Sequence, residues 1–401
     1  MHKFKYLLFI LIALISILLM VLVYRIINSK IEYTLIDNVK VEFLSDVKVS
    51  HFISDIDGEL INDYKIDTTK VGKKEIKFKA INNKHIKASS SFYIEVVDTT
   101  EPLLWLNSTY SIPKGSTFDK EFLCVDNYDD NPKCKIEGVY DSNTIGTYNM
   151  KFIATDSSGN EASKDFTLNV YEPVKKDNNN TTSNSTNTNT VKGIPLSYFI
   201  EKYKTDNTEI GIDVSKWQGD IDFTSVKDAG VEFVFIRVGS KLGIDGDYFV
   251  DKYFIDNIKK AKEVGLPVGV YFYSYANDEK QALKDAKFVY KQIKKYDIDL
   301  NVVFDWENWK NYNDYHLSLY HLSNVAKTYL DYFKDLGYKP MLYSSKTYLE
   351  SFWMDTDYDV WLAHYVDNTN YEGNYKYWQV SDKGLVDGIN ANVDINIRYL
   401  D

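Results

Sequence analysis

The sequence has few of the side chains that usually build metal centres. Its 401 residues include two cysteines and six histidines, and no H-x-x-x-H or C-x-x-C spacing occurs among them. Zinc sites in proteins are usually recognised by ligand spacings of this kind. We therefore expect no metal site and no cofactor.

An excess of positive charge is also absent. Lysine and arginine together number 47 against 58 acidic residues, which gives a formal net charge of −11. Nucleic-acid-binding domains usually carry a basic patch or stripe, and none emerges along this chain. We therefore expect no nucleic-acid partner. The length alone predicts two to four domains.

Aromatic residues, in contrast, are plentiful. The chain has 33 tyrosines and seven tryptophans. Aromatic rings stack on sugar faces, so this composition suits carbohydrate binding, but a tyrosine-rich core explains it equally well. Composition does not decide between these two explanations.

A long apolar run lies near the N-terminus, at residues 6–24. Its nineteen residues carry no charge, and as a helix they are long enough to cross a hydrocarbon core of roughly 30 Å. Basic residues stand on both sides of the run, so the flanking charges do not set its orientation. Because no small-residue cleavage site is evident, we predict an uncleaved anchor after a cytoplasmic tail at 1–5. A cleaved signal peptide is the alternative.

Residues 31–98 and 99–173 are predicted to form two all-β domains. Short runs of alternating apolar and polar residues are separated by Gly, Asn and Asp throughout this region. The run at 71–80 is repeated at 145–154, an offset of 74 residues (145 − 71). The repeated pattern resembles bacterial immunoglobulin-like modules, clearly in the second copy and more loosely in the first. The resemblance implies two immunoglobulin-like β-sandwiches.

The two cysteines lie in the second of these domains, on either side of the acidic segment VDNYDDNPK. A turn between strands would bring Cys124 and Cys134 within disulfide reach. A bridge that closes so short a loop is worth ~2–3 kcal/mol in the chain-entropy model, and it indicates an oxidising, extracytoplasmic setting. Two free thiols are the alternative.

Residues 174–193 are predicted to form a flexible linker. The segment KKDNNNTTSNSTNTNTVK within it has no apolar residue before Val191. Such a composition cannot bury enough surface to offset the entropy of ordering the chain. We expect it to connect the β domains to a separate C-terminal domain.

Residues 208–401 alternate strand and helix patterns and are expected to form an α/β domain, a (β/α) barrel. The expected strands lie at 209–213, 233–239, 267–274, 301–307, 340–344, 360–363, 377–380 and 393–397. Amphipathic stretches separate the earlier strands. Buried apolar strands joined through helices form parallel sheets, and about eight of them favour a closed barrel.

Four acidic residues are placed where such a barrel carries its chemistry, at the carboxyl ends of strands. Asp213 ends the first expected strand, Asp305 and Glu307 end the fourth, and Asp394 lies in the last. The two side chains of the D-x-E segment project to the same side of an extended strand, so one pKa should rise and make that group a candidate general acid. Taken alone, D-x-E is also a common surface tripeptide. Convergence from three separate segments favours a functional site.

Several motifs, in the same order, resemble the lysozymes of glycoside hydrolase family 25, the Chalaropsis-type muramidases. They are GIDVSKWQG at 211–219, FIR at 235–237, PVGVYFYS at 267–274, DWE at 305–307, WLAHY at 361–365, WQ at 378–379 and VDIN at 393–396. The resemblance covers residues 208–401. It departs at Val380, where the family often has Tyr, and at Trp306, where smaller aliphatic residues are common. We expect the Trp306 side chain to face the helical layer.

This resemblance implies a role for each acidic residue. Glu307 would be the general acid that protonates the glycosidic oxygen. Asp305 would assist it, either by raising its pKa or by orienting the N-acetyl group of the substrate, and Asp213 and Asp394 match the remaining acidic positions. The implied reaction is hydrolysis of the β-1,4 bond between N-acetylmuramic acid and N-acetylglucosamine in peptidoglycan, with the acetamido group as nucleophile and retention of configuration.

The same motifs supply candidates for substrate binding. These residues are Tyr271, Tyr273, Trp361, Tyr365, Trp378 and Gln218. Of the aromatic ones, Tyr273, Trp361, Tyr365 and Trp378 are expected to stack on sugars. For each of them a role in core packing is an equal alternative.

Together these features predict a single-pass bacterial membrane protein whose C-terminal domains lie outside the cell and face the wall. Its partners would be peptidoglycan strands and, through the immunoglobulin-like domains, envelope proteins. Its function would be remodelling or opening of the wall.

Two alternatives remain for this function. An adhesive or wall-binding protein without turnover would be favoured by loss of Glu307 or Asp213, and both are present. A chitinase-type enzyme would carry a D-x-x-D-x-D-x-E strand, whereas apolar residues occupy 302–304 before Asp305.

Overall fold

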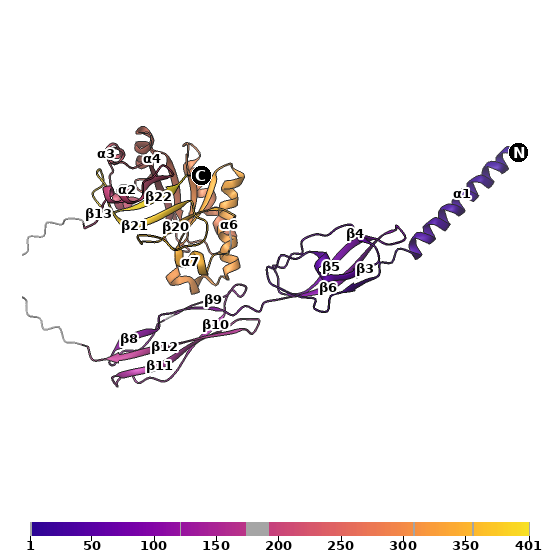
Figure 1. Cartoon of the computed structure of the whole chain (residues 1–401), viewed down its shortest axis with the longest axis horizontal. Helices are drawn as coiled ribbons and strands as arrows, with labels where there is room; N and C mark the ends of the chain where they lie inside the picture. The colour runs from indigo at the N-terminus through magenta and orange to yellow at the C-terminus, as the bar shows by residue number, and fades with distance from the viewer. Residues whose placement is uncertain (1, 121, 174–191, 308, 355–356, 401) are drawn as a thin grey trace, which may run out of the picture. The chain divides into compact units, whose positions relative to one another are not determined.

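The computed structural model describes residues 2–120, 122–173, 192–307, 309–354 and 357–400. The chain divides into two compact units. One is Met1–Glu101 with Ser158–Asn160, and the other is Pro102–Ser157 with Glu161–Asp401. The linker expected at 174–193 falls almost wholly on residues outside the described part of the chain. Figure 1 shows the elements of both units.

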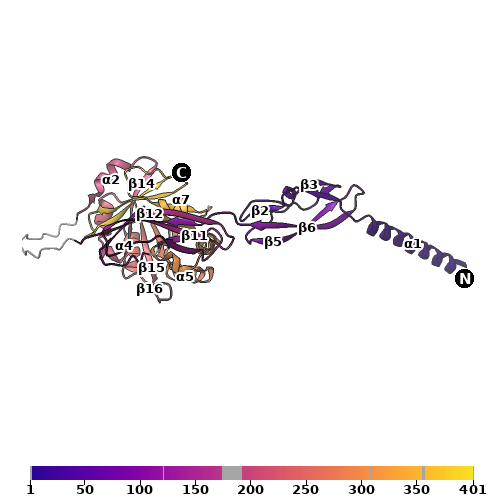
Figure 2. The same ribbon diagram turned by 90° about the horizontal axis from the view of Figure 1, so that it is seen from below.

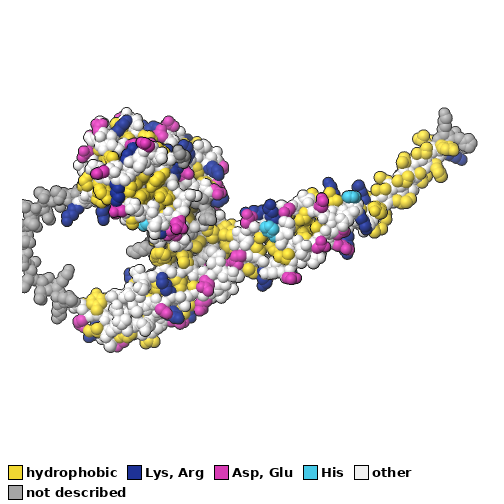
Figure 3. Space-filling model, in the orientation of Figure 1, with side chains coloured by type: hydrophobic (Ala, Val, Ile, Leu, Met, Phe, Trp, Pro, Cys, Tyr) yellow, Lys and Arg dark blue, Asp and Glu magenta, His cyan; other side chains and the backbone are white. Residues whose placement is uncertain are grey.

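The first unit begins with one long apolar helix, α1 (His2–Ile27). Residues Phe4–Ile27 have a mean hydropathy of 3.2, and none of them is buried within the protein. Apolar side chains cover the helix in the space-filling view (Figure 3). A helix that is apolar on every side is typical of a membrane span. An N-terminal signal sequence has the same apolar character.

The β module of the first unit, which corresponds to the domain expected at 31–98, contains two small sheets. The larger has the strand order β2 (Lys40–Glu42), β6 (Lys87–Val97), β5 (Gly72–Ile81) and β4 (Glu59–Leu60), and the smaller pairs β1 (Tyr33–Leu35) with β3 (Ile53–Ile56). The two long strands β5 and β6 alternate buried apolar and exposed polar residues. Figure 2 shows them side by side. This period of two buries one face of the sheet.

The second unit opens with a β module that corresponds to the domain expected at 99–173, here called the second β module. Its larger sheet has the order β10 (Lys133–Glu137), β11 (Gly146–Thr155), β12 (Glu161–Tyr171) and β8 (Thr109–Pro113), and its smaller sheet pairs β7 (Leu103–Trp105) with β9 (Leu123–Val125). A disulfide joins Cys124 in β9 to Cys134 in β10 and so links the two sheets.

The sequence repeat recurs in these modules. Strand β5 begins at Gly72 and β11 at Gly146, again an offset of 74 residues (146 − 72). In both copies the strand pairs antiparallel with the one that follows it. Each module, however, has a four-stranded and a two-stranded sheet among its described residues, fewer strands than the seven of an immunoglobulin sandwich. The immunoglobulin-like assignment is therefore not confirmed.

The C-terminal domain is built on a ring of eight strands. They are β14 (Thr208–Val214), β15 (Phe233–Lys241), β17 (Val268–Tyr273), β18 (Asn301–Asp305), β19 (Lys339–Ser345), β20 (Asp359–Ala363), β21 (Tyr377–Leu385) and β22 (Val393–Tyr399). Neighbours from β14 to β21 are parallel. The last strand, β22, runs antiparallel to both β21 and β14 and closes the ring.

This ring differs from the regular (β/α) barrel that the sequence predicts. Helices α3 (Phe223–Asp228), α4 (Phe254–Glu263), α5 (Glu279–Ile293), α6 (Leu319–Asp335) and α7 (Lys346–Ser351) follow the first five strands. Among the described residues, no helix follows β20 or β21. An antiparallel strand needs no helical crossover, so β22 follows β21 through a short loop. The domain is therefore a closed ring of strands with helices after the first five, and a regular (β/α) barrel is not confirmed.

Shorter elements complete the domain. Strand β13 (Ile194–Pro195) pairs with β21, helix α2 (Leu196–Tyr203) leads into the ring, and β16 (Tyr248–Val250) pairs with β15. Two 3-10 turns, η2 (Lys216–Gln218) and η3 (Trp309–Tyr315), follow β14 and β18.

The ring has an inner and an outer apolar layer. Val303, Phe235 and Trp361 belong to the inner cluster, whereas Phe304 and Trp306 pack outside with residues of the helices. The expectation that Trp306 faces the helical layer is confirmed.

A glycine on β17 makes room for the inner layer. A Cβ atom at Gly269 would overlap the ring of Phe235 on the neighbouring strand. Overfilling a packed core in this way costs free energy because side chains and backbone must move. The aromatic filling of the ring therefore requires a residue without a side chain at this position.

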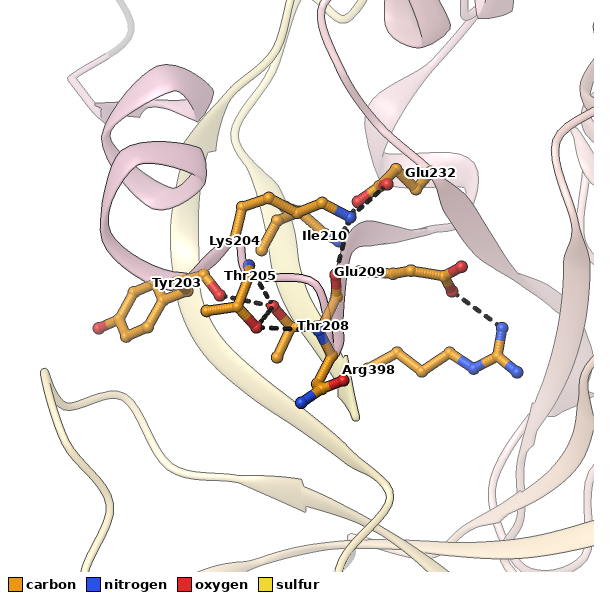
Figure 4. Close-up of polar contacts among 9 residues, drawn as sticks. Tyr203, Lys204, Thr205, Thr208, Glu209, Ile210, Glu232 and Arg398 are labelled. Atoms are coloured by element: carbon orange, nitrogen blue, oxygen red, sulfur yellow. Dashed lines mark hydrogen bonds and ion pairs between the residues drawn. The ribbon is translucent and has the colours of Figure 1, made fainter. Parts of the chain in front are cut away.

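Polar contacts fix the amino-terminal edge of the first strand (Figure 4). The Thr208 hydroxyl donates to the carbonyl of Tyr203 at 2.7 Å, and Lys204 contacts Glu232 at 2.5 Å. Arg398 of β22 donates to Glu209 of β14 at 2.9 Å. These contacts lie at the edge opposite the strands' carboxyl ends, where polar networks usually serve stability.

Candidate active site

Two adjoining pockets lie at the carboxyl ends of the strands. One, of about 230 Å³, is lined by all four acidic residues that the sequence singles out, Asp213, Asp305, Glu307 and Asp394. The other, of about 480 Å³, shares Glu307, Tyr343 and Tyr365 with it. The ring therefore brings together side chains from three strands and the residue just beyond one of them, as the barrel prediction requires.

Asp213 is fixed by two amide groups on neighbouring strands. Its Oδ2 atom accepts hydrogen bonds from Gln379 Nε2 at 2.9 Å and from Asn396 Nδ2 at 2.8 Å. Burial raises the pKa of Asp213 to about 6, although these two hydrogen bonds lower it. Asp213 therefore stands in a rigid setting and titrates near neutral pH.

Aromatic side chains determine which way the two amides point. The hydroxyls of Tyr343 and Tyr365 both donate to Gln379 Oε1 at 2.8 Å. In the same way, Trp361 Nε1 donates to Asn396 Oδ1 at 2.8 Å. Because the oxygen of each amide is occupied by a donor, the nitrogen is left to face Asp213. Sequence reasoning identified Gln379 and Asn396 only as parts of motifs.

Asp305 and Glu307 form the second acidic group. Asp305 is buried at the end of β18, and Glu307 lies at the opening of the pocket. Burial, and then the charge of Glu307, raise the pKa of Asp305 well above its ordinary value. Loss of hydration within the pocket also raises the pKa of Glu307. The pair therefore resists full ionisation at neutral pH.

Asp305 also has an oxygen that the protein leaves unsatisfied. Among the described residues, no group donates a hydrogen bond to its buried Oδ1 atom. A buried carboxylate oxygen without a donor is costly. This atom is therefore ready to accept a hydrogen bond from a group that enters the pocket.

Asp394 lies opposite Asp213 on the paired strands β22 and β14. Burial, and then the charge of Asp213, raise the pKa of Asp394 to about 9. At neutral pH its carboxyl group is therefore mostly protonated and can donate a hydrogen bond.

A cation missed by the sequence-based reasoning also lines the pocket. Arg237 of β15 donates from Nε and Nη2 to Asp251 Oδ2 at 2.8 and 2.5 Å. Its positive charge lowers the pKa of Asp305, against the larger effect of burial. The FIR segment at 235–237 was the available signal, because its charged residue interrupts an apolar strand.

Five of the six candidate substrate-binding residues line the pocket with the carboxylates. They are Tyr271, Tyr273, Tyr365, Trp361 and Gln218. Trp361 is 2% exposed, and its ring stacks on Phe235 at 4.7 Å, so it forms the floor. The Gln218 amide is occupied within the chain, since it accepts from the Ser215 amide and donates to the Asn392 carbonyl.

Trp378 does not take the position that stacking on a sugar requires. It is buried in the outer layer, and its Nε1 atom donates to the His364 carbonyl at 2.8 Å. Of the two roles that the sequence leaves open for Trp378, the structure shows core packing and not stacking on a sugar. Trp217, which was not singled out, is 71% exposed and lines the pocket. Exposure distinguishes Trp217 from Trp378 as a ring that could stack on a sugar. The pattern of a strand does not reveal how exposed a side chain is.

Comparison with known proteins places this domain among carbohydrate-cleaving enzymes. The family model described as glycosyl hydrolases family 25 matches residues 212–389. The autolytic lysozyme of Clostridium acetobutylicum is 30% identical over 189 residues, which are 46% of this chain and 54% of the relative. This chain thus spans about half the length of that lysozyme.

Two further proteins are each similar to about half of the chain. The protein YegX of Escherichia coli K12 is 31% identical over 215 residues, which are 51% of this chain and 74% of the relative. The solved structure of a family 25 glycosyl hydrolase from Bacillus anthracis has a TM-score of 0.43 and 23% identity, and the match covers 50% of this chain and 93% of that one.

Proposed function

The chain belongs to glycosyl hydrolase family 25, and on this basis we propose that it cleaves the β-1,4 bond between N-acetylmuramic acid and N-acetylglucosamine in peptidoglycan. The observation that carries the proposal is the meeting of Asp213, Asp305, Glu307 and Asp394 in one pocket. The similarity to a lysozyme described as autolytic supports a wall polymer as substrate.

Glu307 is proposed as the general acid that protonates the leaving oxygen. It lies where the two pockets meet, so a glycan chain that occupies both would pass its carboxyl group. A raised pKa supports this role because the group keeps its proton at a pH where an ordinary glutamate has lost it.

Asp305 is proposed to hold the N-acetyl group of the substrate. In the free protein burial raises the pKa of both carboxyl groups, and the charge of Glu307 raises that of Asp305 further. An amide N–H donated to the unsatisfied Oδ1 atom would stabilise the ionised form of Asp305. The proton of the pair would then reside on Glu307, where the leaving group needs it. Substrate binding would thus leave Glu307 protonated and able to act as the general acid.

The exposed aromatic side chains are proposed to bind sugars. Trp217 offers the most exposed ring of the pocket, and Tyr365 is 50% exposed beside Glu307. Rings of this kind pack against the apolar faces of sugars. Asp213 and Asp394, side by side on paired strands, would hold the sugar through hydrogen bonds.

We also propose that α1 anchors the protein in the cell membrane with the family 25 domain outside, facing the wall. The apolar surface of the helix and its length support this proposal. The two β modules would serve as spacers or contact other envelope proteins. Wall remodelling, or wall opening for an assembly, would be the process served.

The proposal is tested by replacing the general acid. Glu307→Gln should lower the rate of peptidoglycan solubilisation at least ~10²-fold, because a positioned acid contributes about that much. Glu201→Gln, an exposed residue on α2, is the matched control and should keep full activity. Turbidity loss of purified peptidoglycan with the full chain measures both rates. Equal rates for Glu307→Gln and the unchanged protein would contradict the proposal.

A further inference from the structure

We propose that the second β module positions the active site. It caps helix α6 and holds the 3-10 turn η3, and both of these follow Asp305 and Glu307 in the chain. The proposal rests on the proposed hydrolase function. Both parts belong to the same compact unit. The positioning residues are Asp130 and Trp105 of the module and Asn313 of η3.

The first contact is a cap on helix α6. The first amides of a helix have no partner within the helix itself. Here the Leu319 amide donates to the Asp126 carbonyl at 2.8 Å, and the Tyr320 amide donates to the Asn127 carbonyl at 3.3 Å. The second β module therefore supplies acceptors that a helix usually takes from its own preceding residues.

Asp130 adds a charged contact at the same place. Its Oδ1 atom accepts from the Ser318 amide at 2.7 Å and lies 2.5 Å from His321 Nδ1. A carboxylate is favourable at a helix N-terminus because the helix dipole is positive there. Asp130 thus ties the module to the start of α6 through two separate groups.

The second contact lies on η3, which begins two residues after Glu307. The Asn313 side chain donates to the Phe122 carbonyl at 2.8 Å, and its oxygen lies 3.5 Å from the Cys124 amide. Cys124 is held in turn by its disulfide to Cys134. The segment after Glu307 therefore contacts a part of the module that the disulfide stabilises.

The third contact is apolar and reaches the pocket wall. Val125 of β9 is 1% exposed and belongs to the outer core of the barrel domain. The Trp105 ring lies 6.4 Å from that of Tyr348 and 6.0 Å from that of Phe352. Tyr348 lines the pocket that contains Glu307. The module therefore supports a side chain that faces the substrate.

Aromatic side chains of η3 connect these contacts to Asp305 and Glu307. Tyr312 and Tyr315 of η3 pack their rings 5.8 and 5.0 Å from that of Trp306. Trp306 stands between Asp305 and Glu307 in the chain and is fully buried. Small displacements of reacting groups are costly in enzymes, so loosening η3 should reduce turnover without removing a catalytic group.

The test compares substitutions of Asp130 in the full chain. Asp130→Ala should lower kcat about tenfold, with KM little changed, because the reacting groups lose their placement. Asp130→Asn keeps an oxygen acceptor for the Ser318 amide and should restore most of kcat. Asp165→Ala, an exposed acidic residue on β12 that pairs with Lys151, is the control and should leave kcat unchanged.

Hydrogen exchange provides a readout that does not depend on activity. In the unchanged protein the amides of 318–320 should exchange slowly, and in Asp130→Ala they and those of 309–315 should exchange faster. Rapid exchange in the unchanged protein, or a normal kcat in Asp130→Ala despite faster exchange, would overturn the proposal. If the unchanged protein does not cleave peptidoglycan, the proposed function fails. Exchange across 309–315 then decides whether the module holds this segment.

Discussion

Asp213 and Asp394 face each other on paired antiparallel strands, an arrangement in which two like charges repel. Their pKa values of about 6 and about 9 mean that the folded protein binds protons that the unfolded chain releases near pH 3.8. The free energy of unfolding is highest where both groups are protonated, and it falls as the pH rises through these two values. The protein tolerates this cost at the site of its proposed chemistry.

One substitution should recover the lost stability. Asp394→Asn keeps the shape and is neutral without binding a proton, so at pH 8, where the unfolded chain releases the Asp394 proton, it should raise the free energy of unfolding by ~2 kcal/mol. The gain should shrink toward pH 4, where Asp394 of the unfolded chain also becomes protonated. Thermal unfolding at both pH values measures it, with the exposed Asp297→Asn as control. An equal gain at pH 4 and pH 8 would refute the electrostatic explanation.

The positions of the acidic residues could be predicted from the sequence. Each acidic residue sits at or next to a strand end, which a period-two pattern reveals, and all four meet in the pocket. Trp378 and Trp217 each lie in a short motif that does not show which ring is accessible. Only the packed structure shows that the first is buried and the second exposed.

At the scale of elements, the turn after β18 depends on one large side chain. Trp306 is fully buried among aromatic residues of η3, and its Nε1 atom donates to the Ala276 carbonyl at 3.0 Å. It therefore joins β18 to both the turn after β17 and the segment after Glu307. A smaller residue would leave a cavity and an unsatisfied carbonyl.

Trp306→Ala should lower the free energy of unfolding by ~3–5 kcal/mol, the usual cost of emptying such a site. Trp306→Phe should cost less because it keeps most of the packing and loses only the hydrogen bond and part of the volume. Urea unfolding followed by circular dichroism gives both values. Comparable losses for the two variants would show that the hydrogen bond, rather than packing, is what matters.

The order of elements could be read from the sequence, but the closure of the ring could not. Apolar runs identified the strands of the barrel, and amphipathic stretches identified the longer helices. The strand expected at 377–380 ends earlier than β21, which extends to Leu385. The loop before β22 is therefore too short for a parallel return, and this shortness is visible only in the structure.

At the scale of the whole molecule, the predicted disulfide lies at the contacts between the second β module and the barrel domain. The bond between Cys124 and Cys134 joins two sheets, and the Cys124 amide lies 3.5 Å from the side-chain oxygen of Asn313. Nothing local in the sequence announces the contacts of Asp130 with α6, because 188 residues separate it from Ser318. Contacts between distant segments are the part of the structure that pattern reading leaves out.

Removing both cysteines should destabilise the second β module. The double variant Cys124→Ala, Cys134→Ala should lower its free energy of unfolding by ~2–3 kcal/mol, because the unfolded chain loses a loop constraint. The double change avoids a lone thiol. Thermal unfolding of the full chain with and without a reductant provides the measurement. No change in melting on reduction of the unchanged protein would contradict the structural role of the bond.

Product analysis identifies the bond that the pocket cleaves. Purified peptidoglycan is digested with the full chain, the new reducing ends are reduced with borohydride, and the terminal sugars are identified by mass spectrometry. Muramitol is expected at every new end, and it should be lost in Glu307→Gln. Glucosaminitol would mean that the site cleaves the other glycosidic bond, and the absence of any new reducing end would contradict hydrolysis altogether.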